Sequence, residues 1–220
     1  MERLLSLCIG YIFGLFQTAY IYGKANHIDI RDFGSGNAGT TNAMRVLGKK
    51  AGIITYLGDC LKAILACVVV YLIFRGETVH YRFILRIYTG LGVVLGHNFP
   101  FYMGFKGGKG IAASSGVIIG LADFKIMLIS LFVFVFTTVF TKYVSVGSLA
   151  LMFAFFVELI IFNELGILGL KSNLKFTGNE RIEIYILILV ISGLAFIKHS
   201  ANIKRLIEGN ERKIGQKKEV

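Results

Sequence analysis

Long apolar stretches alternate with short polar segments along the whole chain. A helix that crosses a bilayer needs about 20 apolar residues, with some tolerance. Seven stretches approach this length, so we expect an all-α integral membrane protein, a polytopic bundle of about seven transmembrane helices. The expected spans are 4–23, 51–74, 87–105, 110–124, 126–141, 148–162 and 182–198, and the fourth to sixth are short. Because no internal repeat or linker divides the chain, we expect residues 1–220 to form a single transmembrane domain.

The composition agrees with a membrane location. Of 220 residues, 55% are hydrophobic and 17% are charged, whereas soluble domains average about 45–50% apolar and about 25% charged residues. Lys and Arg number 24 against 13 Asp and Glu. In a soluble protein such an excess indicates nucleic acid, but in a membrane protein it indicates anionic lipid, topology or an anionic substrate. We therefore expect membrane lipid and no nucleic acid as a partner.

The cysteine and histidine residues give little information about function. The chain has 3 Cys and 4 His, with no spacing that would hold a metal ion. The odd number of cysteines excludes a complete disulfide framework. All three lie in apolar runs, so we expect them to be small buried residues.

The distribution of positive charge predicts the orientation. With seven spans, fifteen Lys and Arg lie on one side of the membrane and eight on the other, with Lys62 inside a span. The positive-inside rule places the richer side in the cytoplasm. The N-terminus is then outside and the C-terminus cytoplasmic. The polar stretches 34–50, 96–110 and 198–213 all reach the cytoplasmic face, where together they could form one site.

The first polar stretch, GSGNAGTTNAMRVLGKKAG, begins with the pattern G-x-G-x-x-G. A dinucleotide site needs a buried strand before this pattern and an acidic residue about 20 residues on. The preceding HIDIRDF is polar and Asp59 lies in an apolar span, so no dinucleotide cofactor is expected. Two interpretations remain: a flexible loop with a helix cap at Thr41 or Asn42, or a nest of backbone N–H groups for an anion. The groups available to an anion are the backbone at Gly34 and Gly36, the side chains of Ser35, Asn37, Thr40, Thr41 and Asn42, the guanidinium of Arg45, and the charges of Lys49 and Lys50.

The second stretch, GHNFPFYMGFKGGKGIAASSG, is also rich in glycine and lysine. Gly107 and Gly108 between Lys106 and Lys109 offer flexible backbone donors flanked by two cations. This is no P-loop, because glycine follows Lys109 where Ser or Thr would hold magnesium. Pro100 removes a backbone donor and should kink or end the preceding helix. The helix that follows is rich in small residues, so we expect it to pack centrally.

The third stretch is KHSANIKRLIEGNERK. His199 and Asn202 share one helix face with Ile203 and Leu206, at spacings of three, four and seven residues. One interpretation is an amphipathic basic tail that lies on anionic lipid. His199 and Asn202 occupy the apolar face where such a helix would carry leucine, which favours a polar site for these two.

Four of the polar residues inside the expected spans are interpreted individually. His97 is interpreted mainly as a satisfied core histidine, with a functional role as the alternative. Asp59 and Lys62, three residues apart, can pair on one helix face and support the first loop. Glu158 is given no role.

These stretches together resemble the three motifs of the bacterial acyl-phosphate:glycerol-3-phosphate acyltransferases, the PlsY family. GSGNAGTTNAMRVLGKKAG, GHNFPFYMGFKGGKGIA and HSANIKRLIEGNERKIG match in order and spacing, as do IDIRDFGSGN, GDCLKA and KYVSVGSL. The chain departs from the family at Ala38, where Pro is frequent, at Thr40, where Ala is frequent, and in lacking a Pro near the end of the first span. These differences affect loop stiffness more than charge.

The resemblance implies a seven-span enzyme of the bacterial inner membrane with its active site facing the cytoplasm. It would transfer a fatty acyl group from acyl phosphate to the 1-hydroxyl of glycerol 3-phosphate, giving lysophosphatidic acid and inorganic phosphate. No metal or other cofactor is implied, and the soluble enzyme that makes acyl phosphate is a candidate partner. The alternatives are a membrane carrier for organic phosphate anions and a non-catalytic scaffold for anionic lipid.

The resemblance also implies residue roles. Ser35 and Arg45 would bind phosphate, Lys106 and Lys109 would bind phosphate or neutralise the leaving group, and His199 and Asn202 would orient glycerol 3-phosphate. The remaining implied binding positions are Gly34, Gly36, Asn37, Thr41, Asn42, Gly107, Gly108 and Glu211, the last of these bracing the tail or a cation. Either His199, whose side-chain type titrates near neutral pH, or a substrate phosphate would take the hydroxyl proton.

Overall fold

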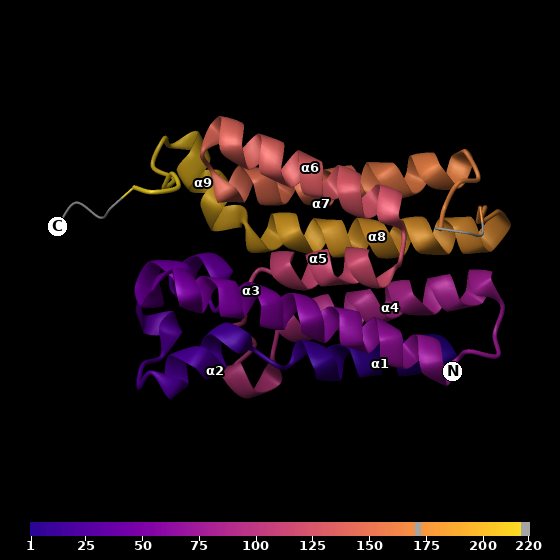
Figure 1. The fold of residues 1–220 in the computed structure, drawn as a ribbon, viewed down its shortest axis with the longest axis horizontal. Helices are drawn as coiled ribbons and strands as arrows, with labels where there is room; N and C mark the ends of the chain where they lie inside the picture. Colours follow the sequence, from indigo (N-terminus) through magenta and orange to yellow (C-terminus); the bar gives the residue numbers. More distant parts are fainter. Residues whose placement is uncertain (170–172, 217–220) are drawn as a thin grey trace. The chain divides into compact units, whose positions relative to one another are not determined.

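A computed structural model describes residues 1–169 and 173–216. The chain forms two compact units, Met1–Ala122 and Asp123–Val220, and each is a bundle of helices (Figure 1). Within the described residues no strand is present, and the only β-type pairing is an isolated bridge between Leu168 and Leu174. The all-α prediction is confirmed, and no strand precedes the glycine pattern as a dinucleotide fold would require.

The first unit contains seven helical elements. They are α1 (Glu2–Gly14), α2 (Thr18–Ala25), the 3₁₀ turn η1 (Ile30–Asp32), α3 (Thr40–Ile73), α4 (Val79–Asn98), the 3₁₀ turn η2 (Phe101–Met103) and α5 (Ile111–Gly120). The described part of the second unit contains α6 (Phe124–Thr141), α7 (Val144–Glu164), α8 (Gly178–Lys198) and α9 (Ser200–Ile207).

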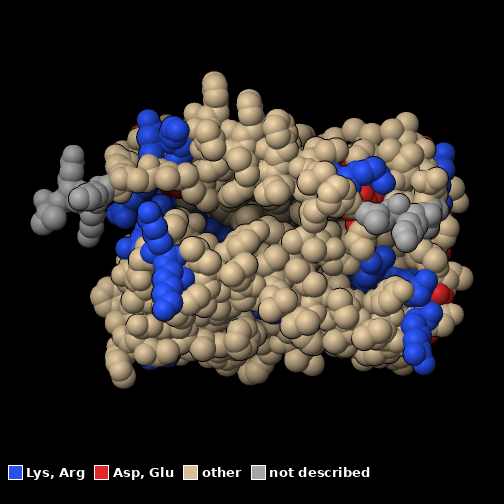
Figure 2. Space-filling view, viewed as in Figure 1, with Lys and Arg blue, Asp and Glu red and all other residues tan. Residues whose placement is uncertain are grey.

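The helices carry the apolar surface of a membrane protein. Among the described residues, four helices are long and apolar enough to cross a membrane, counting α1 and α2 as one, and the bent pair α8 and α9 makes up to five. On α6 the rings of Phe132, Phe136 and Phe140 stack in sequence and are 65%, 59% and 81% exposed. Figure 2 shows Lys and Arg gathered near the helix ends, with a broad band of other residues between them. The chain is therefore a multi-pass membrane protein, while the count of seven spans and the orientation stay predictions. Three residues that entered the charge count, Lys171, Lys217 and Lys218, lie outside the described residues.

The predicted helix limits differ from the structure most clearly at the first three spans. The first expected span is broken between Gly14 and Thr18 into α1 and α2. The second helix starts at Thr40 rather than 51. The third helix starts at Val79 rather than 87, and the Thr78 hydroxyl before it accepts a hydrogen bond from the Tyr81 amide. It ends at Asn98 rather than 105, because Pro100 follows.

Glycines bring α1 and α4 into close contact. Gly10 and Gly14 on α1 face Gly92 and Gly96 on α4, and a Cβ at any of them would overlap the facing backbone. Small residues four apart allow this approach in membrane helices, where packing rather than the hydrophobic effect holds helices together. The N-terminal end of α1 is also tied to the start of α4, because Tyr81 donates a hydrogen bond to Glu2.

The helix after the second stretch, α5, packs closely against α3, as its small residues predict. A Cβ at Gly116 on α5 would overlap the carbonyl of Cys60 on α3, so these two helices are in backbone contact. Cys60 and Cys67 are buried on the same side of α3, as expected. Cys8 is exposed on α1, so the expectation of burial was wrong for that residue.

The second unit is joined by buried polar contacts. Glu158 on α7 accepts a hydrogen bond from Ser130 on α6 at 3.2 Å. At one end of the unit, Asp123 accepts hydrogen bonds from the amides that begin α6 and from the Gly169 amide at 2.7 Å. At the other end, the Ile214 amide donates to the Lys142 carbonyl, which brings the segment after α9 to the α6–α7 turn.

Candidate functional site

The first loop is shaped by two glycines and one asparagine. Gly34 and Gly36 have φ of +65° and +69°, a region that L side chains rarely adopt. The buried Asn42 side chain accepts a hydrogen bond from the Ser35 amide at 2.8 Å and donates to the carbonyls of Ile30 and Phe33 at 3.0 Å. The polar atoms of the Asn42 side chain are thus used within the loop, whereas Ser35 is exposed at the surface.

The helix that follows carries Arg45 on a short first segment. Its N-cap is Gly39, and no side chain caps it, so the predicted cap at Thr41 or Asn42 is wrong. Gly48, with φ of +85°, interrupts α3 and turns the chain back on itself. A Cβ at Gly52 would lie 2.7 Å from Cβ of Met44, which shows how closely the two segments pack. Arg45 is exposed on the segment before this kink.

An ion pair stiffens the approach to this loop. The Asp29 carboxylate accepts hydrogen bonds from the Arg31 side chain at 2.8 and 3.0 Å. The Arg31 guanidinium holds the pKa of Asp29 at about 2. Arg31 also donates to the carbonyl of Met103 in η2 at 3.3 Å. The pair therefore connects the first polar stretch to the second, a link that the sequence pattern does not reveal.

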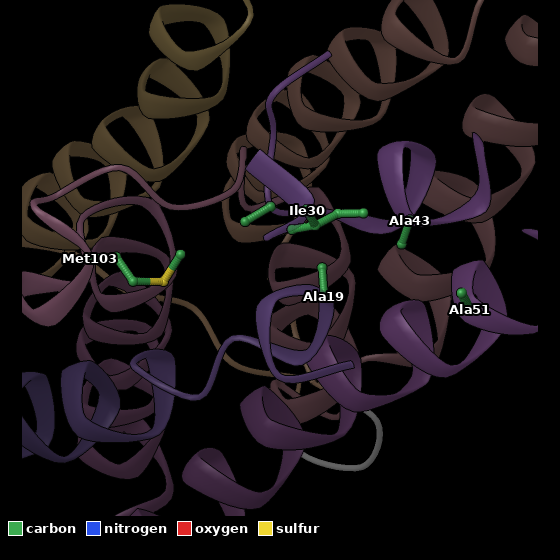
Figure 3. Close-up of a cluster of buried hydrophobic side chains, with 6 residues drawn as sticks. Ala19, Ile30, Ala43, Ala51 and Met103 are labelled. Atoms are coloured by element: carbon green, nitrogen blue, oxygen red, sulfur yellow. The ribbon is translucent and has the colours of Figure 1, made fainter. Parts of the chain in front are cut away.

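Apolar side chains complete this connection. Ile30 of η1 lies beside Ala19 of α2, with Ala43 and Ala51 on the two segments of α3 (Figure 3). The full buried cluster consists of Ala19, Ile30, Ala38, Ala43, Ala51 and Met103. Because it includes Ala38 from the first loop and Met103 from η2, the two loops pack on one apolar base.

The second loop is held by the end of α4. The amides of Gly107 and Gly108 donate to the carbonyls of Asn98 and His97 at 3.3 and 3.1 Å. These hydrogen bonds differ from the prediction that both amides face an anion, and they give the two glycines a structural role. Gly108 is buried against the first loop, since a Cβ there would lie 2.8 Å from the Ala38 carbonyl oxygen. Lys106 is exposed and Lys109 is partly buried on this loop.

One end of the first unit thus carries several of the predicted groups. The contact between the loops brings together the segments that hold Ser35, Arg45, Lys106 and Lys109. The N-terminus lies at the opposite end, because Glu2 contacts the start of α4 whereas these loops contact its end. The concentration of cations and helix N-terminal amides favours binding of a phosphate group.

The third polar stretch builds a separate group in the second unit. α8 and α9 meet at His199 with a bend of 55°. The His199 side chain is buried, and its Nδ1 lies 2.7 Å from the Ala195 carbonyl oxygen. A carbonyl only accepts, so Nδ1 carries the proton, and Nε2 of the neutral ring is the nitrogen that can take one.

Glu211 anchors the segment after α9. Its carboxylate accepts hydrogen bonds from Asn202 at 2.6 Å, from Arg205 at 2.7 Å and from Ser145 of α7 at 2.9 Å. Burial would raise the pKa of Glu211, but these hydrogen bonds outweigh it and hold the pKa below its ordinary value. Asn202 and His199 are both buried on one face of the bend, as their spacing predicts. Ser145, in the KYVSVGSL segment, is a supporting residue that no spacing argument had singled out.

The predicted residues therefore fall into two groups. Ser35, Arg45, Lys106 and Lys109 belong to the first unit, and His199, Asn202 and Glu211 to the second. Asn37 and Thr41 lie partly buried beside the first loop. Within the described residues no cluster of three or more His, Cys, Asp or Glu is placed to hold a metal ion.

Comparison with known proteins adds a family match over nearly the whole chain. Residues 4–209 match the family model described as glycerol-3-phosphate acyltransferase. A glycerol-3-phosphate acyltransferase from Thermoanaerobacter sp. (strain X514) is 38% identical over 221 residues, covering 100% of both chains. One from Clostridioides difficile (strain 630) is 39% identical and covers 96% of this chain and 95% of its own.

Solved structures give the same match at the level of fold. The crystal structure of PlsY, an integral membrane glycerol 3-phosphate acyltransferase in its glycerol 3-phosphate form, superposes with a TM-score of 0.80 at 28% identity. It covers 98% of this chain and 96% of that one. The lysophosphatidic acid form of PlsY superposes with a TM-score of 0.78.

Proposed function

Since the chain belongs to the glycerol-3-phosphate acyltransferase family, we propose that it acylates the 1-hydroxyl of glycerol 3-phosphate with acyl phosphate as the donor. The products are lysophosphatidic acid and inorganic phosphate. The observation that carries this proposal is the contact between two glycine-rich basic loops at one end of the first unit. Both substrates carry a phosphate group, and such loops supply the cations and amides that phosphates prefer.

Phosphate binding is assigned to the polar and basic side chains of these two loops and of the short helix segment after the first. Arg45 binds a phosphate through its planar fork, and Ser35 donates its hydroxyl. Lys106 and Lys109 act on the acyl phosphate, where positive charge stabilises the carbonyl oxygen and the leaving phosphate as negative charge develops on them. The braced geometry of the first loop keeps Ser35 in place without any contribution from a ligand.

His199 and Asn202 are assigned to glycerol 3-phosphate. In the tautomer set by Ala195, Nε2 of His199 takes the proton of the 1-hydroxyl as its oxygen attacks the acyl carbon. A new C–O ester bond forms, the bond between acyl carbon and phosphate oxygen breaks, and phosphate leaves with the bonding electrons. The alternative base is a phosphate oxygen of a bound substrate. Glu211 holds Asn202 in position for this step.

The acceleration comes mainly from holding the two substrates together. Acyl phosphate is already an activated mixed anhydride, so no covalent acyl-enzyme is required. Well-oriented reactants gain effective molarities of about 10⁵–10⁸ M. We place the active site at the cytoplasmic face of the inner membrane, where soluble glycerol 3-phosphate reaches it. The soluble enzyme that makes acyl phosphate is a partner there.

The experiment uses purified full-length protein in proteoliposomes with labelled glycerol 3-phosphate. Acyl phosphate, acyl-CoA and acyl-carrier protein are compared as donors. The expected result is conversion to lysophosphatidic acid with acyl phosphate alone, and a large loss of turnover without unfolding in Ser35→Ala and His199→Ala. Accumulation of unmodified glycerol 3-phosphate inside the vesicles would instead indicate a carrier, and conversion with acyl-CoA alone would overturn the donor assignment.

A further inference from the structure

A buried ionic cluster lies beneath the two basic loops. Asp59 and Lys62 on α3 and His97 on α4 are 1%, 4% and 2% exposed. Lys62 Nζ lies 3.0 Å from Asp59 Oδ1 and 2.9 Å from His97 Nδ1. Because an ammonium group only donates, His97 Nδ1 accepts from Lys62, and the ring proton is on Nε2.

The cluster also secures the break between α1 and α2. Lys62 donates to the carbonyls of Gly14 and Phe16, which α1 leaves without helical partners at its end. Gln17 donates to the His97 carbonyl at 3.0 Å. Asp59 accepts a hydrogen bond from Thr18, the first residue of α2, at 3.0 Å. The three ionic residues therefore connect the end of α1, the start of α2, α3 and α4.

The opposite edge of the His97 ring lies against Gly108 of the second loop, at the point where Gly108 packs on the first loop. A Cβ at Gly108 would overlap His97 Nε2 and would lie 2.8 Å from the Ala38 carbonyl oxygen. Gly108 in turn donates its amide to the His97 carbonyl at 3.1 Å. The ring thus stands between the ionic cluster on one side and, on the other, the place where the loop of Ser35 meets the loop of Lys106 and Lys109.

The energetic cost of burying this ionic cluster, together with its geometry, indicates a role beyond stabilising the fold. Removing an ion pair from water is expensive, and apolar residues of similar volume commonly serve a core as well or better. Lys62 orients the His97 ring from one side, and on its other side the ring supports Gly108, where the two loops meet. This arrangement is suited to fixing the distance between the loops. None of the three side chains is needed to contact substrate for this.

We propose that His97, oriented by Lys62 and Asp59, is a positioning residue that sets the separation of the two phosphate-binding loops. The inference rests on the proposed function for the identity of the substrates. The two ring edges have separable tasks: Nδ1 satisfies Lys62 and maintains the fold, and the Nε2 edge supports Gly108, which itself packs against the Ala38 carbonyl.

Two substitutions separate these tasks. His97→Asn retains a polar atom near the Nδ1 position, so it still accepts from Lys62, but it removes the Nε2 edge. His97→Gln reaches the Nε2 position and loses the Nδ1 acceptor. Thr55→Val is the matched control, since Thr55 is buried on α3 one turn before Asp59 and its hydroxyl has no partner among the described residues.

The variants are measured as full-length protein for KM of both substrates, kcat and melting temperature. For His97→Asn the expected result is a rise in both KM values of about tenfold or more with an unchanged melting temperature, since misplaced loops weaken binding in the ground state. For His97→Gln we expect a lower melting temperature and KM within about threefold of wild type. Thr55→Val should leave the KM values and the melting temperature unchanged.

Hydrogen exchange gives a readout that does not depend on activity. In His97→Asn, amides of residues 34–39 and 106–110 should exchange faster, while those of α6 and α7 stay unchanged. Unaltered KM values and unaltered loop exchange in His97→Asn would overturn the proposal. A lower melting temperature together with raised KM values in both variants would also overturn it, because that result indicates a purely structural histidine. An inactive wild-type protein whose loops still respond to His97→Asn would refute the proposed function and leave the positioning role standing.

Discussion

At the scale of single residues, the first loop depends on a contact that only glycine permits. The Asn42 side chain that fixes the Ser35 amide lies directly against Gly34, and a Cβ there would overlap its Oδ1. The φ of +65° at Gly34 adds strain for any other residue, at a cost of about 1–2 kcal/mol. The position of Ser35 is thus determined by its neighbours and not by its own side chain.

This contact leads to the first prediction. Gly34→Ala should displace Asn42 and Ser35, and should reduce kcat/KM for glycerol 3-phosphate by about tenfold or more, equivalent to about 1.4 kcal/mol of transition-state stabilisation. Steady-state kinetics of purified protein provides the measurement. Gly76→Ala is the control, since a Cβ at Gly76 meets nothing within 4 Å. Equal activities of the two variants would show that Asn42 does not position Ser35.

A second prediction concerns pH and Glu211. Its folded-state pKa is lowered, so its ionised form stabilises the fold above the unfolded-state pKa of about 4.3. That stabilisation is lost as the pH falls through the lower folded-state value. Glu211→Gln should therefore lower the melting temperature at pH 7, and the difference from wild type should shrink on acidification. Thermal melts over a pH series test this, with the exposed Glu208→Gln as control. A pH-independent difference would contradict the assignment.

The sequence predicted the exposure of some of these residues but not the hydrogen-bond partners of others. Ser35, Arg45 and Lys106 are polar residues in glycine-rich loops, and the structure leaves them exposed as such a position implies. Asn42 and Gly108 were expected beside an anion, yet their polar groups bond to the protein itself. Hydrogen-bond partners depend on which distant segments meet, and no spacing rule contains that information.

At the scale of helices, the apolar stretches of the sequence predicted the long helices, but only some of the irregularities have local causes. The break between α1 and α2 occurs in the cleanest apolar run of the chain, because Lys62 and Gln17 supply hydrogen-bond partners for the interrupted backbone. The kink at Gly48 has a local cause in its φ of +85°. The end of α4 was foreseeable from Pro100, whereas its early start depends on a cap at Thr78.

The third prediction addresses the α1–α4 contact. Gly10→Ala places a methyl group against the Thr89 carbonyl, and overpacking of this kind costs about 1–3 kcal/mol. The melting temperature of the purified protein should fall measurably. Gly193→Ala on α8, where a Cβ meets nothing within 4 Å, should leave it unchanged or raise it slightly. A stable Gly10→Ala protein would mean that the two helices are not in the close contact described.

At the scale of the whole molecule, the chain was expected to form one domain, and the structure resolves two compact units that divide at Ala122 and Asp123. No proline- or serine-rich linker marks this point, because α5 and α6 follow one another with a short turn. The three motifs are divided between the units, two in the first and one in the second. The proposed reaction therefore requires that both units present their groups at the same membrane face.

A distance between two spin labels tests most directly whether both units present their groups at the same membrane face. Labels are attached at Lys49→Cys and Ser200→Cys, two exposed positions beside Arg45 and His199, after replacement of Cys8, Cys60 and Cys67 by alanine. If the motifs converge at one face, the separation is shorter than the hydrocarbon thickness of about 30 Å. A separation larger than that thickness would place the two groups on opposite sides of the bilayer and would contradict a shared site.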